Sequence, residues 1–177
     1  YRKKGLINDV IKSFKKAIDS MVKVLLINPN DAETHNNLGI AFSEIENLDE
    51  AVKSYQKAVA IKPEFADAHN NLGSVLQKLH RYEDAIKSFE KAFDIKPDID
   101  YILGNILSAK MNSCNWDDFS ILLNNAKKKI LNNEKAVDPF NLMAWSDDPA
   151  LQRKATELMV NNVYPKSHSL PKINFYS

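Results

Sequence analysis

One pentapeptide occurs twice in this 177-residue chain, and the spacing of its two copies constrains the fold more than any other feature. The segment His35-Asn36-Asn37-Leu38-Gly39 recurs 34 positions later as His69-Asn70-Asn71-Leu72-Gly73. The same offset relates further pairs of equal or similar residues: Ala51 and Ala85, Tyr55 and Phe89, Ala58 and Ala92, and Pro63 and Pro97. A fixed period of this length is typical of repeat architectures, in which each unit packs only against its neighbours.

The repeated residue types indicate a unit made of two helices. Gly39 and Gly73 remove the side chain where the first helix of a unit would meet its second helix. Glycine costs about 1 kcal/mol in a helix interior, so its presence predicts a close backbone approach. Alanines seven residues apart, such as Ala51 and Ala58, lie on one face of a helix and keep that contact close. Pro63 ends the second helix, because proline lacks the N–H group and clashes with the preceding turn.

This period and this order of residues resemble the tetratricopeptide repeat (TPR). The resemblance implies an all-α fold, with helix pairs stacked into a right-handed superhelical solenoid. We expect the chain to divide into a partial, extended first repeat at 1–30, repeats at 31–64 and 65–98, a modified terminal helix pair at 99–133, and a junction toward a further domain at 134–177.

The repeat pattern also runs upstream of the first pentapeptide. Residues 12–17 (KSFKKA) match residues 53–58 (KSYQKA) at a spacing of 41, which is one period plus seven residues. Seven residues make about two helical turns, so a helix can lengthen by this amount and keep the same face. We therefore expect a long helix that includes Ser20 to Leu26 and ends at Pro29.

The segment CNWDDF, residues 114–119, occupies the slot of the turn into a second helix, since Leu48, Tyr82 and Trp116 are 34 residues apart. We expect Trp116 to be a structural aromatic residue there, with Phe119 at the place of Ala51 and Ala85. Cys114 has no neighbouring histidine or cluster of cations, so we expect a packed thiol and not a nucleophile. Gly104 comes three residues earlier than the period predicts, which indicates that the stack ends here.

The region after the repeats contains clear signals for one more helix. Residues 132–135 (NNEK) are polar and indicate a loop. Asp148 followed by Pro149 predicts a helix start, which we expect to run to about Val163 with Leu151, Ala155, Leu158 and Met159 on one face. Pro165 and Pro171 predict an extended link, and residues 172–176 favour a strand or a linker.

Composition excludes several classes of partner. Lysine and arginine number 24 and aspartate and glutamate 23, so the net charge of +1 does not predict nucleic-acid binding. No apolar run approaches the roughly 20 residues that span a bilayer. His35 and His69 lack nearby carboxylate or thiolate partners at helical spacing, so we expect no metal and no cofactor. A single cysteine favours a reducing, cytoplasmic location.

A second resemblance concerns the segment that lies after the repeats. The order of its residues is similar to the junction between repeats and catalytic region in the O-GlcNAc transferase (SPINDLY-like) glycosyltransferases, particularly the bacterial ones. The residues that carry this resemblance are Cys114-x-Trp116-x-x-Phe119, Pro139-Phe140 and Asp147-Asp148-Pro149-x-x-Gln152-x-x-Ala155.

The resemblance implies that this chain is a fragment of a longer enzyme. That enzyme would transfer N-acetylglucosamine from UDP-GlcNAc to serine or threonine hydroxyls of proteins, using two Rossmann-like lobes beyond Ser177 and no metal. This chain would contribute no catalytic residue, since the segment around Pro139-Phe140 lacks the histidines that animal members carry there. The repeats would hold the polypeptide substrate on their concave face.

The resemblance also implies which side chains hold the substrate. An asparagine ladder would grip the peptide backbone, and acids near the start of each first helix would contact substrate side chains. The candidate residues are Asn36, Asn37, Asn70, Asn71, Glu33 and Asp67. A side-chain amide suits this role, because it offers both a donor and an acceptor. Alternatively, these asparagines are only solvated polar positions on their helices.

A non-enzymatic alternative remains open on the sequence alone. The same repeats suit a TPR scaffold or adaptor that mediates protein–protein interaction without any catalytic domain. A clamp for carboxylates would need lysine and arginine on the first helices, whereas these positions are mostly asparagine, serine, glutamine and acids. The alternative is therefore a general scaffold. The sequence does not indicate whether the chain associates with itself.

Overall fold

The computed structural model describes residues 2–163, and over this range the chain forms nine helices and no strand. They are α1 (Arg2–Ile27), α2 (Ala32–Glu44), α3 (Leu48–Ile61), α4 (Ala66–Lys78), α5 (Tyr82–Ile95), α6 (Ile102–Asn112), α7 (Phe119–Leu131), α8 (Pro139–Trp145) and α9 (Pro149–Val163). The expected all-α helical solenoid is confirmed. The segment from Pro165 to residue 176, for which we expected an extended link, lies outside the described residues.

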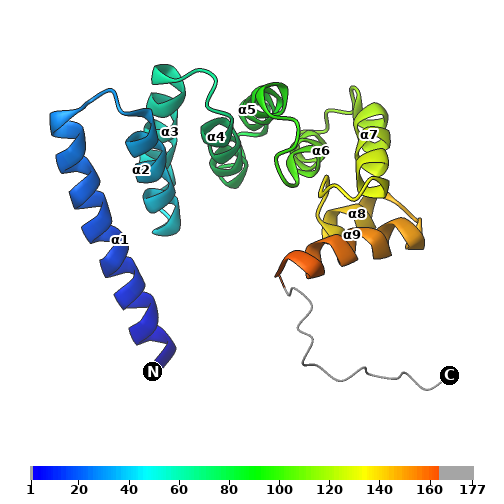
Figure 1. Cartoon of the computed structure of the whole chain (residues 1–177), viewed down its shortest axis with the longest axis horizontal. Helices are drawn as coiled ribbons and strands as arrows, with labels where there is room; N and C mark the ends of the chain where they lie inside the picture. Colours follow the sequence, from blue (N-terminus) through cyan, green and yellow to red (C-terminus); the bar gives the residue numbers. More distant parts are fainter. Residues whose placement is uncertain (1, 164–177) are drawn as a thin grey trace.

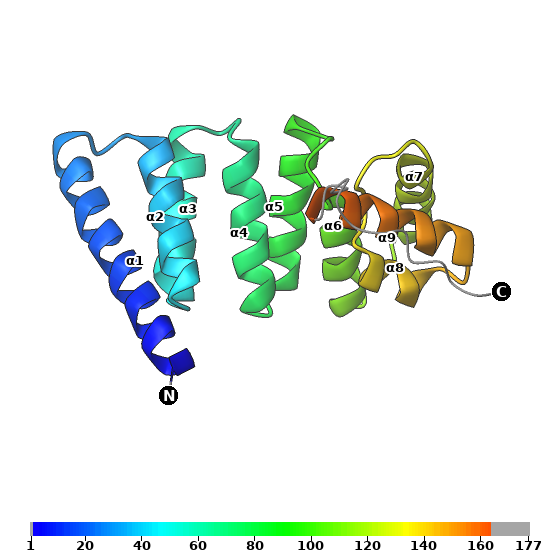
Figure 2. The ribbon, with the colours of Figure 1, turned by 60° about the horizontal axis from the view of Figure 1, so that its bottom comes forward.

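The helices follow one another along an arch, with α1 and α9 turning toward the same side (Figure 1). The helices α2, α4 and α6 lie on the inner side of this arch, and α3 and α5 lie on the outer side. Contacts agree with this view: α2 contacts α4 and α4 contacts α6, whereas α3 and α5 make no direct contact. A second view shows α2 to α5 standing nearly parallel beside α1 (Figure 2). The inner side therefore brings corresponding first helices close together.

Each helix pair closes on a contact between a glycine and an aromatic ring. A Cβ atom placed on Gly39 would lie 2.6 Å from Cε1 of Tyr55, and one placed on Gly73 would lie 2.7 Å from Cδ1 of Phe89. Tyr55 and Phe89 belong to the second helix of the same pair, so the predicted close approach is confirmed. The alanines of the second helices are fully buried beside it: Ala51, Ala58, Ala85 and Ala92.

The turn inside each pair has the same geometry at three positions, 34 residues apart. Glu46, His80 and Cys114 adopt left-handed backbone angles, with φ of 60°, 58° and 55°. Each amide closes a turn on the helix before it, as in the 3.1 Å bond from Cys114 N–H to the Met111 carbonyl. The repeat therefore persists as far as Cys114. This turn leaves the Cys114 thiol exposed, so our expectation of a packed thiol is wrong.

The repeat breaks directly after this turn. Trp116 precedes the next helix by three residues, whereas Leu48 and Tyr82 begin theirs. Trp116 is 60% exposed and contacts Phe119 edge to face, with 5.3 Å between ring centroids. Trp116 therefore makes a structural contact with Phe119, as expected, but it lies in the turn and does not begin the second helix. Phe119 begins α7 and does not take the place of Ala51, because residues 116–118 lengthen the turn.

Gly104 serves a contact that the period did not predict. Its N–H donates to the Ala136 carbonyl at 3.0 Å, and a Cβ there would lie 3.1 Å from Cα of Val137. The glycine is therefore not a displaced repeat glycine. It lets the loop before α8 cross closely over α6, which covers the end of the stack.

The last helix begins at the expected kind of cap. Asp148 accepts hydrogen bonds from the Ala150 and Leu151 amides at 3.0 and 3.2 Å, and Pro149 is the first residue of α9. This helix has the predicted bounds, and its residues Leu151 and Ala155 join the buried core. Within residues 2–163, none of the helices combines the length and apolar character required for a bilayer crossing.

The glycine contacts lead to a test of stability. Gly39→Ala should lower the free energy of unfolding by about 1–3 kcal/mol, because the added methyl group meets the Tyr55 ring and overpacking outweighs the better helix propensity of alanine. Urea unfolding followed by circular dichroism measures this change. Ser120→Ala, at an exposed position of α7, is the control. Unchanged or increased stability of Gly39→Ala would show that the glycine contact does not limit packing.

Candidate functional site

The asparagines singled out by the sequence lie on the first helices of the repeats, along the inner side of the arch. Asn37 is exposed on α2, and Asn71 is half-buried on α4. Asn36 is buried and Asn70 is half-buried. The period places a further asparagine, Asn105, at the same position of α6. The row on the inner side is therefore longer than the sequence pattern predicted.

Hydrogen bonds connect these amides from one repeat to the next. Asn71 donates through Nδ2 to Oδ1 of Asn36 at 3.1 Å. In the same register one repeat later, Asn105 donates through Nδ2 to Oδ1 of Asn70 at 3.4 Å. Each bond joins the second position of the pair, Asn71 or Asn105, to the first asparagine of the preceding repeat. Asn36 and Asn70 thus accept the hydrogen bonds between repeats. The side-chain amides of Asn37, Asn71 and Asn105 keep further donor and acceptor atoms that can bind a ligand.

Asn105 is absent from the residues predicted by sequence, because the neighbouring Gly104 interrupts the repeat pattern. The signal was present, since Asn105 follows Asn71 by 34 residues. A further contact joins the same two helices, where Gln77 donates through Nε2 to the Ser108 hydroxyl at 3.0 Å. The helices α4 and α6 are therefore linked by polar side chains along the inner side.

A hollow of about 270 Å³ opens between α2 and α4 beside Asn71. Its lining combines apolar, hydroxyl, amide and charged side chains: Ile40, Ser43, Glu44, Tyr55, Asn71, Ser74, Val75 and Lys78. Asn37 lies one turn before Ile40, on the same face of α2. The hollow and the amide row therefore form one continuous surface, which we call the inner face.

Tyr55 distinguishes this hollow from the corresponding place in the next repeat, where Phe89 has no hydroxyl. Within the described part of the chain, no hydrogen bond satisfies the Tyr55 hydroxyl. Burial, together with the Glu44 carboxylate, raises the pKa of Tyr55 well above its usual value. At neutral pH the hydroxyl is protonated, as in any tyrosine, and it is an available donor in the hollow.

The acidic candidates lie at the helix starts and not in the hollow. Glu33 and Asp67 are exposed in the first turns of α2 and α4, where the helix dipole favours acids. The Glu33 amide donates to the capping carboxylate of Asp31 at 3.2 Å. Neither acidic side chain lines the hollow, so the structure does not bring them together with Asn71.

The two repeated histidines have a structural role. Nε2 of His35 lies 2.9 Å from the Pro29 carbonyl oxygen, and Nε2 of His69 lies 2.9 Å from that of Pro63. A carbonyl oxygen only accepts, so each Nε2 carries the proton. Each histidine therefore ties the start of a first helix to the turn before it.

The raised pKa of Tyr55 predicts a dependence of stability on pH. Because the folded-state pKa lies above the unfolded value of about 10, the neutral hydroxyl stabilises the fold below that pH. This contribution is lost as the pH rises from about 10 toward the folded pKa. Tyr55→Phe should remove part of the alkaline loss of stability, and should fold normally since Phe89 fills the equivalent place.

Urea unfolding at pH 8 and pH 11 measures this difference. Tyr82→Phe, at a half-buried tyrosine whose hydroxyl lies 2.7 Å from Nδ1 of His80, is the matched control. An equal loss of stability in Tyr55→Phe and in the unaltered chain would contradict the assignment of that loss to the Tyr55 hydroxyl.

Comparisons with known proteins agree with this geometry. Two sequence profiles match, one described as "TPR repeat" over residues 41–80 and one described as "Tetratricopeptide repeat" over residues 66–99. A search of curated protein sequences finds no match.

Solved structures give the same fold. A MamA crystal structure superposes with a TM-score of 0.58 at 29% identity, covering 73% of this chain and 74% of that chain. A second MamA structure has a TM-score of 0.57 at 23% identity, covering 94% and 72%, and supports the fold alone.

A mutant O-GlcNAc transferase from Thermobaculum terrenum matches with a TM-score of 0.50 at 26% identity. This match covers 62% of the present chain and only 23% of the transferase. The profiles, the period and the helix pairs together establish that this chain contains tetratricopeptide repeats, an architecture that generally mediates protein–protein interaction.

Proposed function

We propose that the inner face of α2, α4 and α6 binds an extended polypeptide segment of a partner protein. The observation that carries this proposal is the row of amides, in which Asn71 and Asn105 bond to Asn36 and Asn70 in the same register. The chain would act as an interaction scaffold whose inner face holds the partner.

The chemistry of an extended peptide matches this row. Such a peptide presents an unpaired N–H and C=O at every residue, about 3.3 Å apart. Asn37, Asn71 and Asn105 repeat at one helix position per repeat and offer both donors and acceptors. They would bind the peptide backbone without contacting its side chains, so this binding would not depend on the peptide sequence. This surface therefore favours an extended segment over a folded partner.

The hollow beside Asn71 supplies a place for a peptide side chain. Ile40 offers apolar contact and is 39% exposed, while the Tyr55 hydroxyl offers a donor at the inner end. Lys78 stands at the same hollow and is only loosely paired, 4.0 Å from Glu46. The hollow thus suits a side chain with an apolar stem and a hydrogen-bond acceptor at its tip.

A purely structural role of the amides is the competing interpretation. The bonds of Asn71 and Asn105 to the preceding repeat would then serve only to join the first helices. Asn37 separates the two interpretations, since it is exposed and its side chain makes no hydrogen bond within the described residues. A binding role predicts an effect of Asn37 on affinity, whereas a structural role predicts none.

The test uses a phage library of random twelve-residue peptides selected on the chain. The affinity of a selected peptide is then measured by isothermal titration calorimetry. Asn37→Ala should weaken binding by about fivefold, because a lost hydrogen bond contributes roughly 0.5–1.5 kcal/mol, and adding Asn105→Ala should weaken binding further. Asn124→Ala, which removes an exposed amide from α7, should bind as the unaltered chain does.

Circular dichroism verifies that the variants keep their helices. Unchanged affinity in a folded double variant would exclude peptide binding by the ladder. A library that yields no peptide bound at the inner face would exclude the proposal as a whole.

A second candidate function is supported by two observations. The structure of a glycosyltransferase is similar over 62% of this chain, and residues 114–155 resemble the junction of O-GlcNAc transferases. In this interpretation the inner face holds the polypeptide substrate of an enzyme that transfers N-acetylglucosamine to serine or threonine. The residues described here would contribute binding and not catalysis.

The coding sequence downstream of Ser177 tests this second candidate. An encoded pair of α/β lobes with a nucleotide-sugar site is the expected result. A stop codon, or an unrelated domain, would exclude the transferase and leave the scaffold proposal unaffected.

A further inference from the structure

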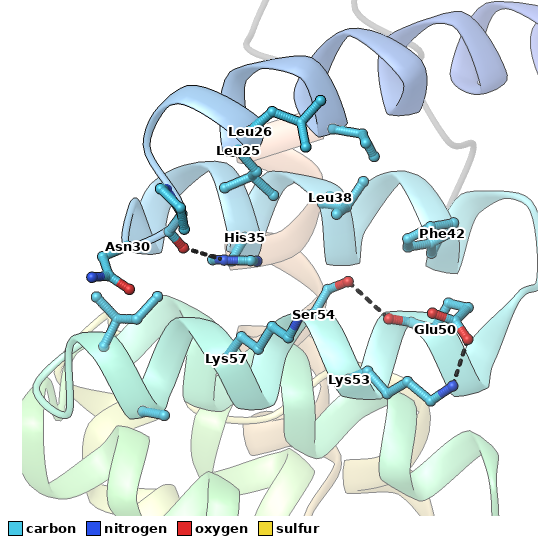
Figure 3. A pocket seen from close by; sticks show the side chains of 14 residues that line it. Leu25, Leu26, Asn30, His35, Leu38, Phe42, Glu50, Lys53, Ser54 and Lys57 are labelled. Carbon is cyan, nitrogen blue, oxygen red and sulfur yellow. Dashed lines mark hydrogen bonds and ion pairs between the residues drawn. The ribbon is translucent and has the colours of Figure 1, made fainter.

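A second concave site lies away from the inner face, between the end of α1 and the pair α2–α3 (Figure 3). Its volume is about 680 Å³, within the range of roughly 300–1,000 Å³ typical of small-molecule sites. Three helices contribute apolar wall residues: Leu25 and Leu26 from α1, Leu38 and Phe42 from α2, and Ile61 from α3. We call this site the α1 groove.

The charged side chains that line the α1 groove carry a net positive charge. Its charged lining residues are Glu50, Lys53 and Lys57. Lys53 and Glu50 form an ion pair at 2.6 Å and neutralise one another. Lys57 has no ion-pair partner among the described residues. The groove therefore combines apolar walls with one surplus positive charge.

The next repeat contains a carboxylate that the α1 groove lacks. There Lys91 of α5 forms an ion pair at 3.1 Å with Glu64, in the turn between α3 and α4. Lys57 precedes Lys91 by one period, and Asn30 precedes Glu64 by the same distance. Asn30 and Lys57 both face the groove (Figure 3). The repeat thus has a place for a carboxylate beside Lys57, and the chain puts a neutral amide there.

A second polar atom in this lining lacks a partner. The His35 side chain is 6% exposed, and its Nδ1 is buried without a hydrogen bond among the described residues. Its Nε2 already faces the Pro29 carbonyl oxygen at 2.9 Å. A buried polar atom without a partner costs roughly 1–3 kcal/mol. Because Nε2 carries the proton, Nδ1 can only accept, so a carboxylate cannot bond to it directly. A water would be stabilising here, since it can donate one hydrogen to Nδ1 and the other to a ligand oxygen.

We propose that the α1 groove is a second binding site, for a small amphiphilic carboxylate. The apolar chain of such a ligand would lie against Leu38 and Phe42. Its carboxylate would pair with Lys57, at the place that Glu64 takes beside Lys91. The charge of the groove selects an anion over a cation, and its walls select an alkyl chain over a sugar. This site does not depend on the proposed peptide binding.

The experiment compares octanoate with 1-octanol as probes, by two-dimensional methyl NMR of the whole chain. Octanoate should bind about tenfold more tightly than the alcohol, because a charged hydrogen bond adds to the same apolar contact. Saturable shifts should appear at the methyl groups of Leu25 and Leu38. Equal affinities for the two probes, or the absence of saturable shifts, would overturn the proposal.

Two variants test the role of Lys57. Lys57→Met should reduce octanoate affinity to that of the alcohol. Asn30→Glu, which reproduces the pair found in the next repeat, should do the same while leaving the lysine in place. Lys87→Met, which removes an exposed lysine from α5, is the control and should not change binding. Full octanoate affinity in either test variant would show that Lys57 does not recognise the carboxylate.

Discussion

The contact between Gly39 and the Tyr55 ring, repeated between Gly73 and Phe89, is the interaction on which the rest of the structure depends. It lets the two helices of each pair approach closely, and the buried alanines at 51, 58, 85 and 92 extend the same close surface. Because each pair then has a fixed shape, successive pairs stack in one register. That register places the first helices α2, α4 and α6 side by side along the inner face.

The amide row follows from this register. Asn71 meets Asn36, and Asn105 meets Asn70, only because corresponding first helices lie at equal heights. The same regularity shows where the chain departs from it. Tyr55 differs from Phe89 by one hydroxyl, and Asn30 differs from Glu64 by one charge. Each departure leaves a polar group without its partner, and each lies at a concave site. Comparison of a repeat with its neighbour is thus a way to locate candidate binding sites.

The ends of the stack show how a repeat stops. At the C-terminal end, the three residues from Trp116 to Asp118 lengthen the turn before α7. The missing side chain of Gly104 lets the loop before α8 pack closely against α6. Trp145 reaches the same region, where its Nε1 lies 3.3 Å from the Met111 sulfur. The core therefore continues through α8 and α9 without another repeat. At the other end, α1 contacts α2 but not α3, just as α3 contacts α4 but not α5, and the α1 groove lies between α1 and the pair α2–α3.

The sequence by itself determined the helix pairs α2–α3 and α4–α5, their period and the start of α9. Identical residues 34 apart, the prolines after α1, α3 and α5 and the Asp148-Pro149 cap are local signals, and local backbone chemistry is enough to interpret them. Only the tertiary structure decided the exposure of Trp116 and Cys114 and the packing contact of Gly104, because exposure and contact depend on elements distant in sequence. It also decided which asparagines pair. Asn37 and Asn71 share a repeat position, yet the bond joins Asn71 to Asn36, since Asn36 is buried against the next repeat whereas Asn37 is exposed.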